Sequence, residues 1–248
     1  MHLEEVRMIP VYVNVFNRLT TTRRLCEQVS RLENCYPVII DNASTWEPLL
    51  EWYSNCPYEV IRLDQNIGHR APWLSGSVRP AADLFWSQID SEFYIITDCD
   101  IDIEGVPLDV ASVLQIPFQW SRPEWSAYQS DYFVVKSGLA LRIDDIPEKQ
   151  GNVLRWESQF WTRPVEEDAR FFWARIDTTF VMIHKSTWHK RAMHSHVVAV
   201  RIAGEYQARH MPWYYNANNV DAETLNYYQT AGRSSTWRPS GRRNRRLV

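Results

Sequence analysis

The sequence predicts an α/β fold in which a mainly parallel central sheet is flanked by helices. In the first part of the chain, short apolar runs rich in β-branched residues alternate with segments of helical periodicity. Polar residues follow these runs, and in such sheets ligands gather at the carboxyl ends of the strands. The chain has 248 residues, 45% of them hydrophobic, which is enough to bury a sizeable core.

The elements of the first half follow from the apolar runs in order. Strands are predicted at residues 9–15, 36–40, 58–63 and 93–97. Thr20 to Thr22 offer N-caps for a helix whose apolar residues share one face. Further helices are predicted at residues 46–53 and 81–89, with a turn at Asn66-Ile67-Gly68 between them.

The second half is less regular. Strands are expected at residues 138–143 and 177–183, a helix at 166–173, and polar loops from Tyr214 onward. No internal repeat or second domain boundary is visible.

The strongest functional signal is the D-x-D motif Asp98-Cys99-Asp100, directly after an apolar strand. Two carboxylates at a strand end would repel each other unless a cation lay between them. Mg²⁺ or Mn²⁺ prefers oxygen ligands and also takes ligands from a substrate diphosphate. The motif therefore predicts a metal site that neutralises a departing nucleoside diphosphate, and the alternative is a solvated acidic turn.

The order of motifs resembles the nucleotide-sugar half of GT-A glycosyltransferases, most closely those of family 2. The resemblance runs from Pro10 to Asp100 and rests on Asn17-Arg18, Asp41-Asn42-Ala43-Ser44-Thr45, Asn66-Ile67-Gly68 and the D-x-D motif. It implies a GT-A fold and a metal-dependent transfer of a sugar from a nucleoside-diphosphate sugar to a hydroxyl of a glycan or lipid-linked acceptor, in glycan or polysaccharide biosynthesis. The resemblance favours inversion, and retention is the alternative. It also implies one domain, with a donor half at residues 1–104, an acceptor half at 105–232 and a flexible basic tail at 233–248.

The resemblance assigns roles to individual residues. Asp41 would hydrogen-bond the base, Asp98 would lie near the ribose or sugar, and Asp100 would bind the metal. Gly68 permits close approach of the nucleoside. For Asp41 the alternative role is that of a turn-forming residue. The donor-binding residues so implied are Val15, Asn17, Arg18, Asp41, Asn66, Gly68 and Asp98.

His210 is the candidate for a second metal ligand. GT-A enzymes often add a late histidine to the metal shell, and imidazole favours Mn²⁺ over Mg²⁺. A structural histidine is the competing interpretation. His189, His194 and His196 also cluster, but their spacing matches no zinc pattern, so surface or structural roles are expected.

Inverting transfer requires a carboxylate to accept the proton of the acceptor hydroxyl. Asp177 is the predicted base because it lies between apolar residues in the region where similar enzymes carry one. Trp156 and Trp161 are expected either to stack on a sugar or to pack in the core. The other acidic candidates are Asp144, Asp145, Glu157 and the run Glu166-Glu167-Asp168.

Other classes fit less well. A nicotinamide dehydrogenase requires a glycine-rich first turn, but the first strand leads into Val15-Phe16-Asn17-Arg18, and the chain has only eight glycines. A sugar-1-phosphate nucleotidyltransferase would have a glycine-rich basic loop at the same place. A catalytically silent carbohydrate- or partner-binding module remains the alternative from a different class.

Charge and cysteine usage predict the partners of the protein, the state of its thiols and its location in the cell. The net charge is −3, but residues 233–248 hold six arginines and no acidic residue, so the body is acidic and nucleic acid is not expected as a partner. The four cysteines form no C-x-x-C pair, which favours free thiols. Without a signal pattern or spanning segment, the expected location is cytoplasmic, with at most peripheral membrane contact.

Overall fold

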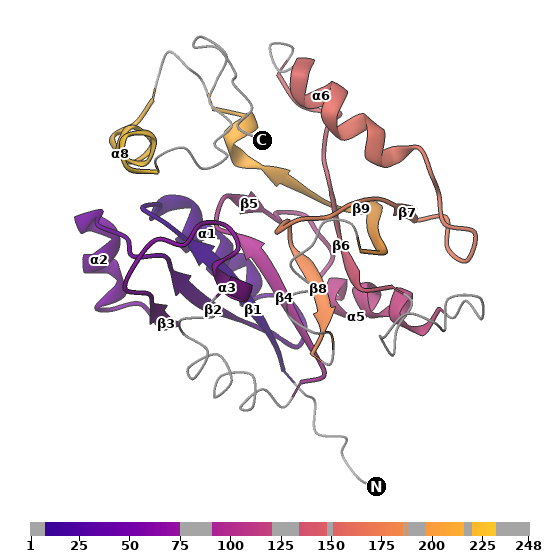
Figure 1. Ribbon diagram of the computed structural model, residues 1–248, viewed down its shortest axis with the longest axis horizontal. Helices are drawn as coiled ribbons and strands as arrows, with labels where there is room; N and C mark the ends of the chain where they lie inside the picture. Colours follow the sequence, from indigo (N-terminus) through magenta and orange to yellow (C-terminus); the bar gives the residue numbers. More distant parts are fainter. Residues whose placement is uncertain are drawn as a thin grey trace, which may run out of the picture.

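The computed structural model describes residues 8–74, 91–120, 134–147, 151–185, 187, 197–215 and 220–231. Within these residues nine strands form one sheet, in the order β3-β2-β1-β4-β8-β6-β9-β5, with β7 paired to β9 (Figure 1). The expected helix at 81–89, the three-histidine cluster and the arginine-rich tail lie outside the described residues.

The first half of the sheet is parallel. It comprises β3 (Glu59–Arg62), β2 (Cys35–Asp41), β1 (Ile9–Val15) and β4 (Phe93–Asp98). In register, Val15 of β1 lies opposite Asp41, and Asn14 lies opposite Asp98. The polar residues that end these strands therefore meet at one edge of the sheet.

The second half of the sheet is mixed. β8 (Val181–His184) lies antiparallel between β4 and β6 (Lys136–Leu141). The long strand β9 (Ala199–His210) runs parallel to β6 with a register shift and antiparallel to β7 (Phe171–Trp173) and to β5 (Ile101–Asp102).

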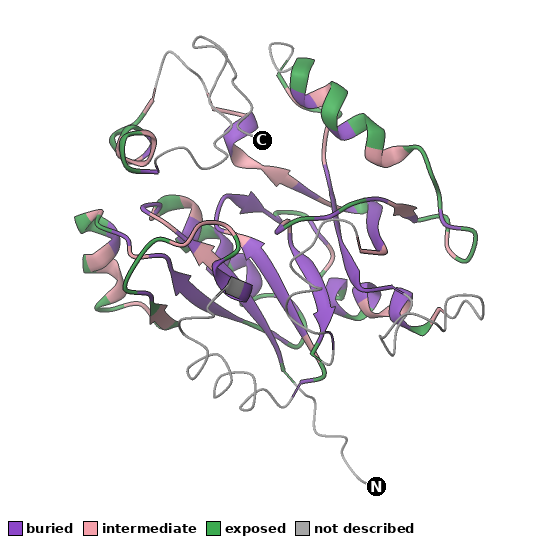
Figure 2. Cartoon of the chain, viewed as in Figure 1, coloured by how far each residue is buried: buried purple, intermediate pink, exposed green. Residues whose placement is uncertain are grey.

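Both faces of the sheet are buried because both faces of its strands are apolar. Val11 and Val13 of β1 face one core cluster, into which α1 (Thr20–Val29) and α5 (Val110–Gln115) pack. Tyr12 faces the other cluster, which includes Trp73 of α3 (Ala71–Leu74). Figure 2 shows the resulting buried centre.

The remaining helices lie around this sheet. They are α2 (Glu47–Tyr53), α6 (Gly151–Glu157) and α8 (Ala222–Thr230), with 3₁₀ turns at Ile116–Gln119, Ser158–Trp161 and Met211–Trp213. In Figure 1, α8 and α6 lie beyond the end of the sheet toward which β4 points. They thus flank the edge at which the polar residues gather.

The predicted α/β fold is confirmed: a central sheet is flanked by helices, and a parallel half continues into antiparallel β8. The first four strands and α2 lie within two residues of their predicted ends. Parallel pairing is less extensive than expected, because β4, β6 and β9 each also have an antiparallel neighbour.

Several local predictions are wrong. The helix expected at 166–173 is absent: its last three residues form β7, whose alternate residues fill the core and flank a cavity. The loops expected after Tyr214 include α8, which Asp221 caps by accepting a hydrogen bond from the Thr224 amide at 2.7 Å. Thr20 to Thr22 begin α1 rather than cap it, and the Glu223 carboxylate accepts from the Thr20 amide at 3.0 Å.

Two further observations concern the cysteines and the possibility of a membrane-spanning helix. All four cysteines are described and unpaired, as expected. Among the described residues, no helix is long and apolar enough to cross a membrane.

Candidate active site

Two cavities that share lining residues lie at the carboxyl end of the parallel strands. The smaller has a volume of about 100 Å³ and the larger about 630 Å³, and both are lined by His69, Asp98 and His210. The smaller is also lined by Asn14, Phe16, Arg18, Asn42, Asn66, Gly68, Cys99, Asp100 and Tyr227. The D-x-D motif and residues 210, 177 and 18 are thus brought to one place from four parts of the chain.

Asp98 is held by the loop that precedes β8. Thr178 Oγ1 donates to Asp98 Oδ2 at 2.5 Å, and the Asp98 amide donates to the Thr178 carbonyl at 3.0 Å. Burial, together with the negative charge of Asp100, raises the pKa of the Asp98 carboxyl well above its usual range. Its position at the junction of the cavities suits a group that contacts the sugar or ribose.

Asp100 and His210 are brought together by pairing between β5 and β9. Ile101 lies opposite His210, and the Met211 amide donates to the Asp100 carbonyl at 2.9 Å. Asp100 Oδ1 lies 3.5 Å from His210 Nε2. Burial opposes ionisation of Asp100, but His210 and Arg18 more than offset this and lower its pKa.

The Asp100–His210 pair fits a divalent cation whose remaining ligands come from a substrate. Asp100 Oδ1, the atom that faces His210 Nε2, is buried and has no hydrogen-bond partner among the described residues. No group of three or more His, Cys, Asp or Glu side chains in the described ranges is arranged to hold a metal. Mg²⁺-type sites often use one or two carboxylates together with substrate phosphates and water, so a two-residue set is sufficient.

Arg18 places a buried positive charge beside this pair. Its guanidinium carbon lies 3.8 Å from the centroid of the Tyr227 ring, and Nη1 donates to Tyr215 Oη at 3.2 Å. No carboxylate forms an ion pair with it in the part of the chain that is described. A buried guanidinium without a carboxylate partner is suited to bind a phosphate.

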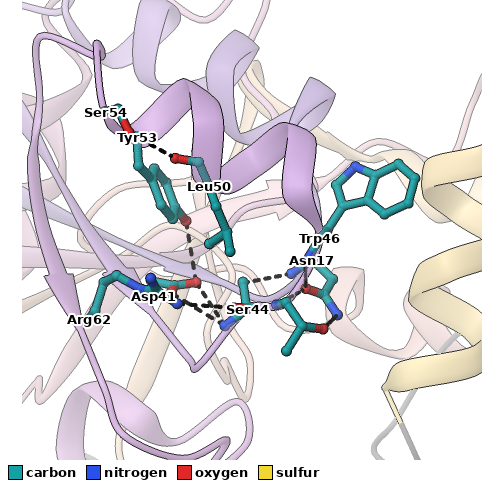
Figure 3. Close-up of polar contacts among 9 residues, drawn as sticks. Asn17, Asp41, Ser44, Trp46, Leu50, Tyr53, Ser54 and Arg62 are labelled. Atoms are coloured by element: carbon teal, nitrogen blue, oxygen red, sulfur yellow. Dashed lines mark hydrogen bonds and ion pairs between the residues drawn. The ribbon is translucent and has the colours of Figure 1, made fainter.

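Asn17 and Asp41, both assigned to the nucleotide, make contacts within the protein (Figure 3). Asn17 Oδ1 accepts from the Thr45 amide at 2.7 Å, and its backbone is left-handed with φ 51°. Asp41 is fully buried and pairs with Arg62 Nε at 2.9 Å. Neither side chain lines the two cavities, nor does that of Val15, which lies in the core.

Asn66 and Gly68 do line the smaller cavity, and Asn42 positions them. Asn42 Oδ1 accepts from the Ile67 amide and Nδ2 donates to the Gly68 carbonyl, each at 2.8 Å. Gly68 has φ 82°, a conformation that side chains with a Cβ rarely adopt. The turn therefore presents backbone to the cavity at a fixed distance from β2.

Asp177 lies in the loop before β8 and lines the larger cavity together with Asp98 and His210. Its side chain is 58% exposed, and Oδ2 lies 3.9 Å from His69 Nε2. The carboxylate thus lies in the open part of the site, within 4 Å of the His69 imidazole. This placement suits a proton acceptor.

Three of the other acidic candidates form ion pairs within the protein. Glu157 lines the larger cavity but forms a buried ion pair with Arg201, with Oε2 and Nη1 3.1 Å apart. Asp145 pairs with Arg209 at 2.7 Å, and Asp168 pairs with Arg170 at 2.7 Å. Asp144 and the 166–167 carboxylates do not line either cavity.

Trp156 lines the larger cavity, whereas Trp161 packs beside Phe172 with ring centroids 5.8 Å apart. Sequence reasoning missed Asn14, Thr178 and Tyr227 as site residues. Asn14 is the one with a local signal, since it stands one residue before the end of an otherwise apolar strand. Thr178 and Tyr227 reach the site through tertiary contacts alone.

Comparisons with known proteins add little to this geometry. No protein-family model matches the sequence, and no curated protein matches it. Among solved structures, the crystal structure of S. aureus TarS is similar at 10% identity, with a TM-score of 0.44. The alignment covers 90% of this chain and 42% of TarS, so the chain spans less than half the length of that protein.

Proposed function

We propose that this protein is a metal-dependent glycosyltransferase that moves a sugar from a nucleoside-diphosphate sugar to a hydroxyl acceptor. The observation that carries the proposal is the Asp100–His210 pair beside the guanidinium of Arg18, with Asp100 Oδ1 buried and without a hydrogen-bond partner among the described residues. Carboxylate, imidazole and guanidinium at the carboxyl ends of parallel strands are the groups needed to hold a diphosphate and a cation.

In this proposal Asp100 and His210 hold the cation, for which Mn²⁺ is favoured over Mg²⁺ because of the imidazole. When bound, the cation supplies charge neutralisation for the diphosphate. Arg18 contributes a second positive charge to the same group. The turn at Asn66 to Gly68 and Asp98 border the nucleoside and sugar.

The larger cavity receives the acceptor. Its hydroxyl oxygen forms the new bond to the anomeric carbon while the bond to the diphosphate oxygen breaks. The hydroxyl proton passes to an Asp177 carboxylate oxygen, and the diphosphate leaves with the bonding electron pair. Attack from the Asp177 side, opposite the diphosphate, inverts the configuration.

Thermal-shift measurements with UDP, GDP and dTDP, each with and without Mn²⁺, test the donor site. A ligand that binds only the folded state at 100 times its Kd adds about 2.7 kcal/mol of stability. One nucleotide is expected to raise the Tm in a Mn²⁺-dependent manner. Asp100→Asn should abolish the Mn²⁺-dependent part, whereas Asp64→Asn, an exposed carboxylate outside both cavities, should leave it intact.

Absence of a shift with every nucleotide would contradict the proposal. A Mn²⁺-dependent shift without hydrolysis or transfer from any nucleotide sugar would instead indicate a catalytically silent binding module of the same fold. Hydrolysis of the donor that is lost in Asp100→Asn with folding intact supports the enzyme.

A further inference from the structure

We infer that the acceptor bound in the larger cavity is anionic, and that Arg163 and Arg175 recognise its carboxylate or phosphate group. This inference rests on the proposed function, since it names the class of acceptor. Three arginines line the cavity, and they differ in whether a carboxylate of the described residues pairs with them.

The cavity has an aromatic wall suited to a sugar. Trp156, Phe160, Trp173 and Trp213 line it, and α6 with its following 3₁₀ turn supplies the first two. Trp156 is 37% exposed. Aromatic faces bind the apolar faces of sugar rings while leaving hydroxyl groups free to form hydrogen bonds.

Arg201 lines the cavity, but its positive charge is neutralised by a carboxylate of the protein. Its Nη1 lies 3.1 Å from Glu157 Oε2, and both side chains are buried. Its Nε donates to the Arg175 carbonyl at 2.8 Å, and its guanidinium lies 4.3 Å from the Phe160 ring centroid. The Glu157–Arg201 pair is therefore an internal support for the wall.

Arg163 and Arg175 are different. Both residues are exposed and line the cavity, and neither forms an ion pair with a carboxylate within the described ranges. Their backbones are fixed: the Arg163 carbonyl accepts from the Trp173 amide at 2.8 Å, and Arg201 holds the Arg175 carbonyl. The two guanidiniums are thus positive charges without an ion-pair partner in the described ranges, on backbone that is held by hydrogen bonds.

Their place in the cavity separates them from the donor. The smaller cavity, with Arg18 and Asp100, is lined by neither arginine. The exposed Asp177 carboxylate puts negative charge at the reacting end. An acceptor with its hydroxyl at Asp177 and an anionic group farther along would match this distribution, because guanidiniums bind carboxylate and phosphate through paired hydrogen bonds.

Binding of simple sugars to the full-length chain tests the inference without requiring turnover. The probes are methyl glucuronide for a carboxylate, glucose-6-phosphate for a phosphate, and methyl glucoside as the neutral reference. Titration at low ionic strength should show about tenfold tighter binding of at least one charged probe. Whichever charged probe binds more tightly identifies the source of the negative charge.

The double variant Arg163→Gln/Arg175→Gln should remove this advantage and leave methyl glucoside binding unchanged. Arg155→Gln, which removes an exposed arginine of α6 outside the cavity lining, serves as the matched control. Charged probes that bind no better than methyl glucoside, or an advantage that survives the double substitution, would overturn the inference. The Mn²⁺-dependent nucleotide shift should persist in the double variant, so failure of this inference is distinguishable from failure of the proposed function.

Discussion

Asp98 and Asp177 are carboxylates in one cavity with opposite surroundings. Asp98 is enclosed by Thr178 and by the ends of the parallel strands, whereas Asp177 is 58% exposed in the next loop. A buried, hydrogen-bonded carboxylate is suited to a fixed contact, and an open one is suited to exchange protons with a bound hydroxyl.

Asp177→Asn should therefore lower transfer by about 10²–10⁴-fold, which is the contribution usual for a general base. The Mn²⁺-dependent nucleotide shift should be unchanged, because the amide is isosteric and residue 177 does not line the smaller cavity that holds Asp100 and Arg18. Single-turnover kinetics and thermal shift on the same variant measure the two effects. Transfer within a few-fold of the unsubstituted protein would assign the base elsewhere.

Cys99, in the middle of the D-x-D motif, has no such exposure. Burial, with the negative charges of Asp100 and Asp98, raises the pKa of its thiol to about 12, although Arg18 opposes this. A thiol of this kind stays protonated at neutral pH, which makes it a poor nucleophile.

At the scale of elements, the loop before β8 is positioned by β6. A Cβ added to Gly138 of β6 would lie 2.2 Å from Ile176 Cδ1 and 2.9 Å from the Phe180 carbonyl oxygen. Ile176 and Phe180 bracket Asp177 and Thr178, so a glycine at this point of β6 allows the loop to approach the sheet. Phe180 itself has φ 36°, which holds the loop in a strained turn.

Gly138→Ala should displace this loop and lower transfer by more than tenfold, with a loss of stability of about 1–3 kcal/mol from overpacking. Gly151→Ala, at the start of α6, is the matched control, since nothing lies within 4 Å of a Cβ built there. Activity assays and urea unfolding of both variants distinguish the effect of displacing the loop from the general effect of replacing a glycine with alanine. Equal activity in the two variants would show that the loop tolerates displacement.

α8 and the β1–α1 connection form one unit despite their distance in sequence. Asn17 Nδ2 donates to Thr230 Oγ1 at 2.8 Å, and Glu223 accepts from Thr20. Tyr227 of the same helix lies under the Arg18 guanidinium. The helix thereby supports the Arg18 guanidinium, to which we assign binding of the diphosphate.

At the scale of the whole molecule, Lys136 is a buried charge that lowers stability. The side chain is fully buried at the start of β6, where Nζ donates to the Ile176 carbonyl at 3.1 Å. Burial lowers its pKa from 10.5 to about 8, while Asp177 opposes the shift. The folded protein therefore releases this proton at a lower pH than the unfolded chain does.

Between the two pKa values the unfolded chain binds more protons, so the free energy of unfolding should rise with pH from about 8 to about 10.5. The contribution of Lys136 to this rise is about 3 kcal/mol at 1.36 kcal/mol per pH unit. Urea unfolding of the protein and of Lys136→Met across this range measures it, because other titrating groups are common to both. Parallel stability curves for the two proteins would contradict the shifted pKa.

The sequence by itself determined the local features of this protein. The continuous apolar, β-branched run at residues 9–15 predicted a strand, and local patterns likewise located β2, β3, β4 and α2. It also put the D-x-D motif at a strand end, because strand and motif are adjacent in the chain. The helix at 166–173 failed because its residues bury their apolar groups as a strand against β9, which periodicity over so short a run does not reveal.

Only the tertiary structure decided which distant residues share the site. Asp100 meets His210 through β5–β9 pairing, Arg18 meets Tyr227 through the packing of α8, and Asp177 reaches the cavity because β8 inserts between β4 and β6. It also decided that Asn17 and Asp41 form internal contacts, while Arg163 and Arg175 line an open cavity. The physical reason is that strand order and compensation of charge depend on contacts between segments far apart in the chain, whereas periodicity and turn chemistry depend on neighbours.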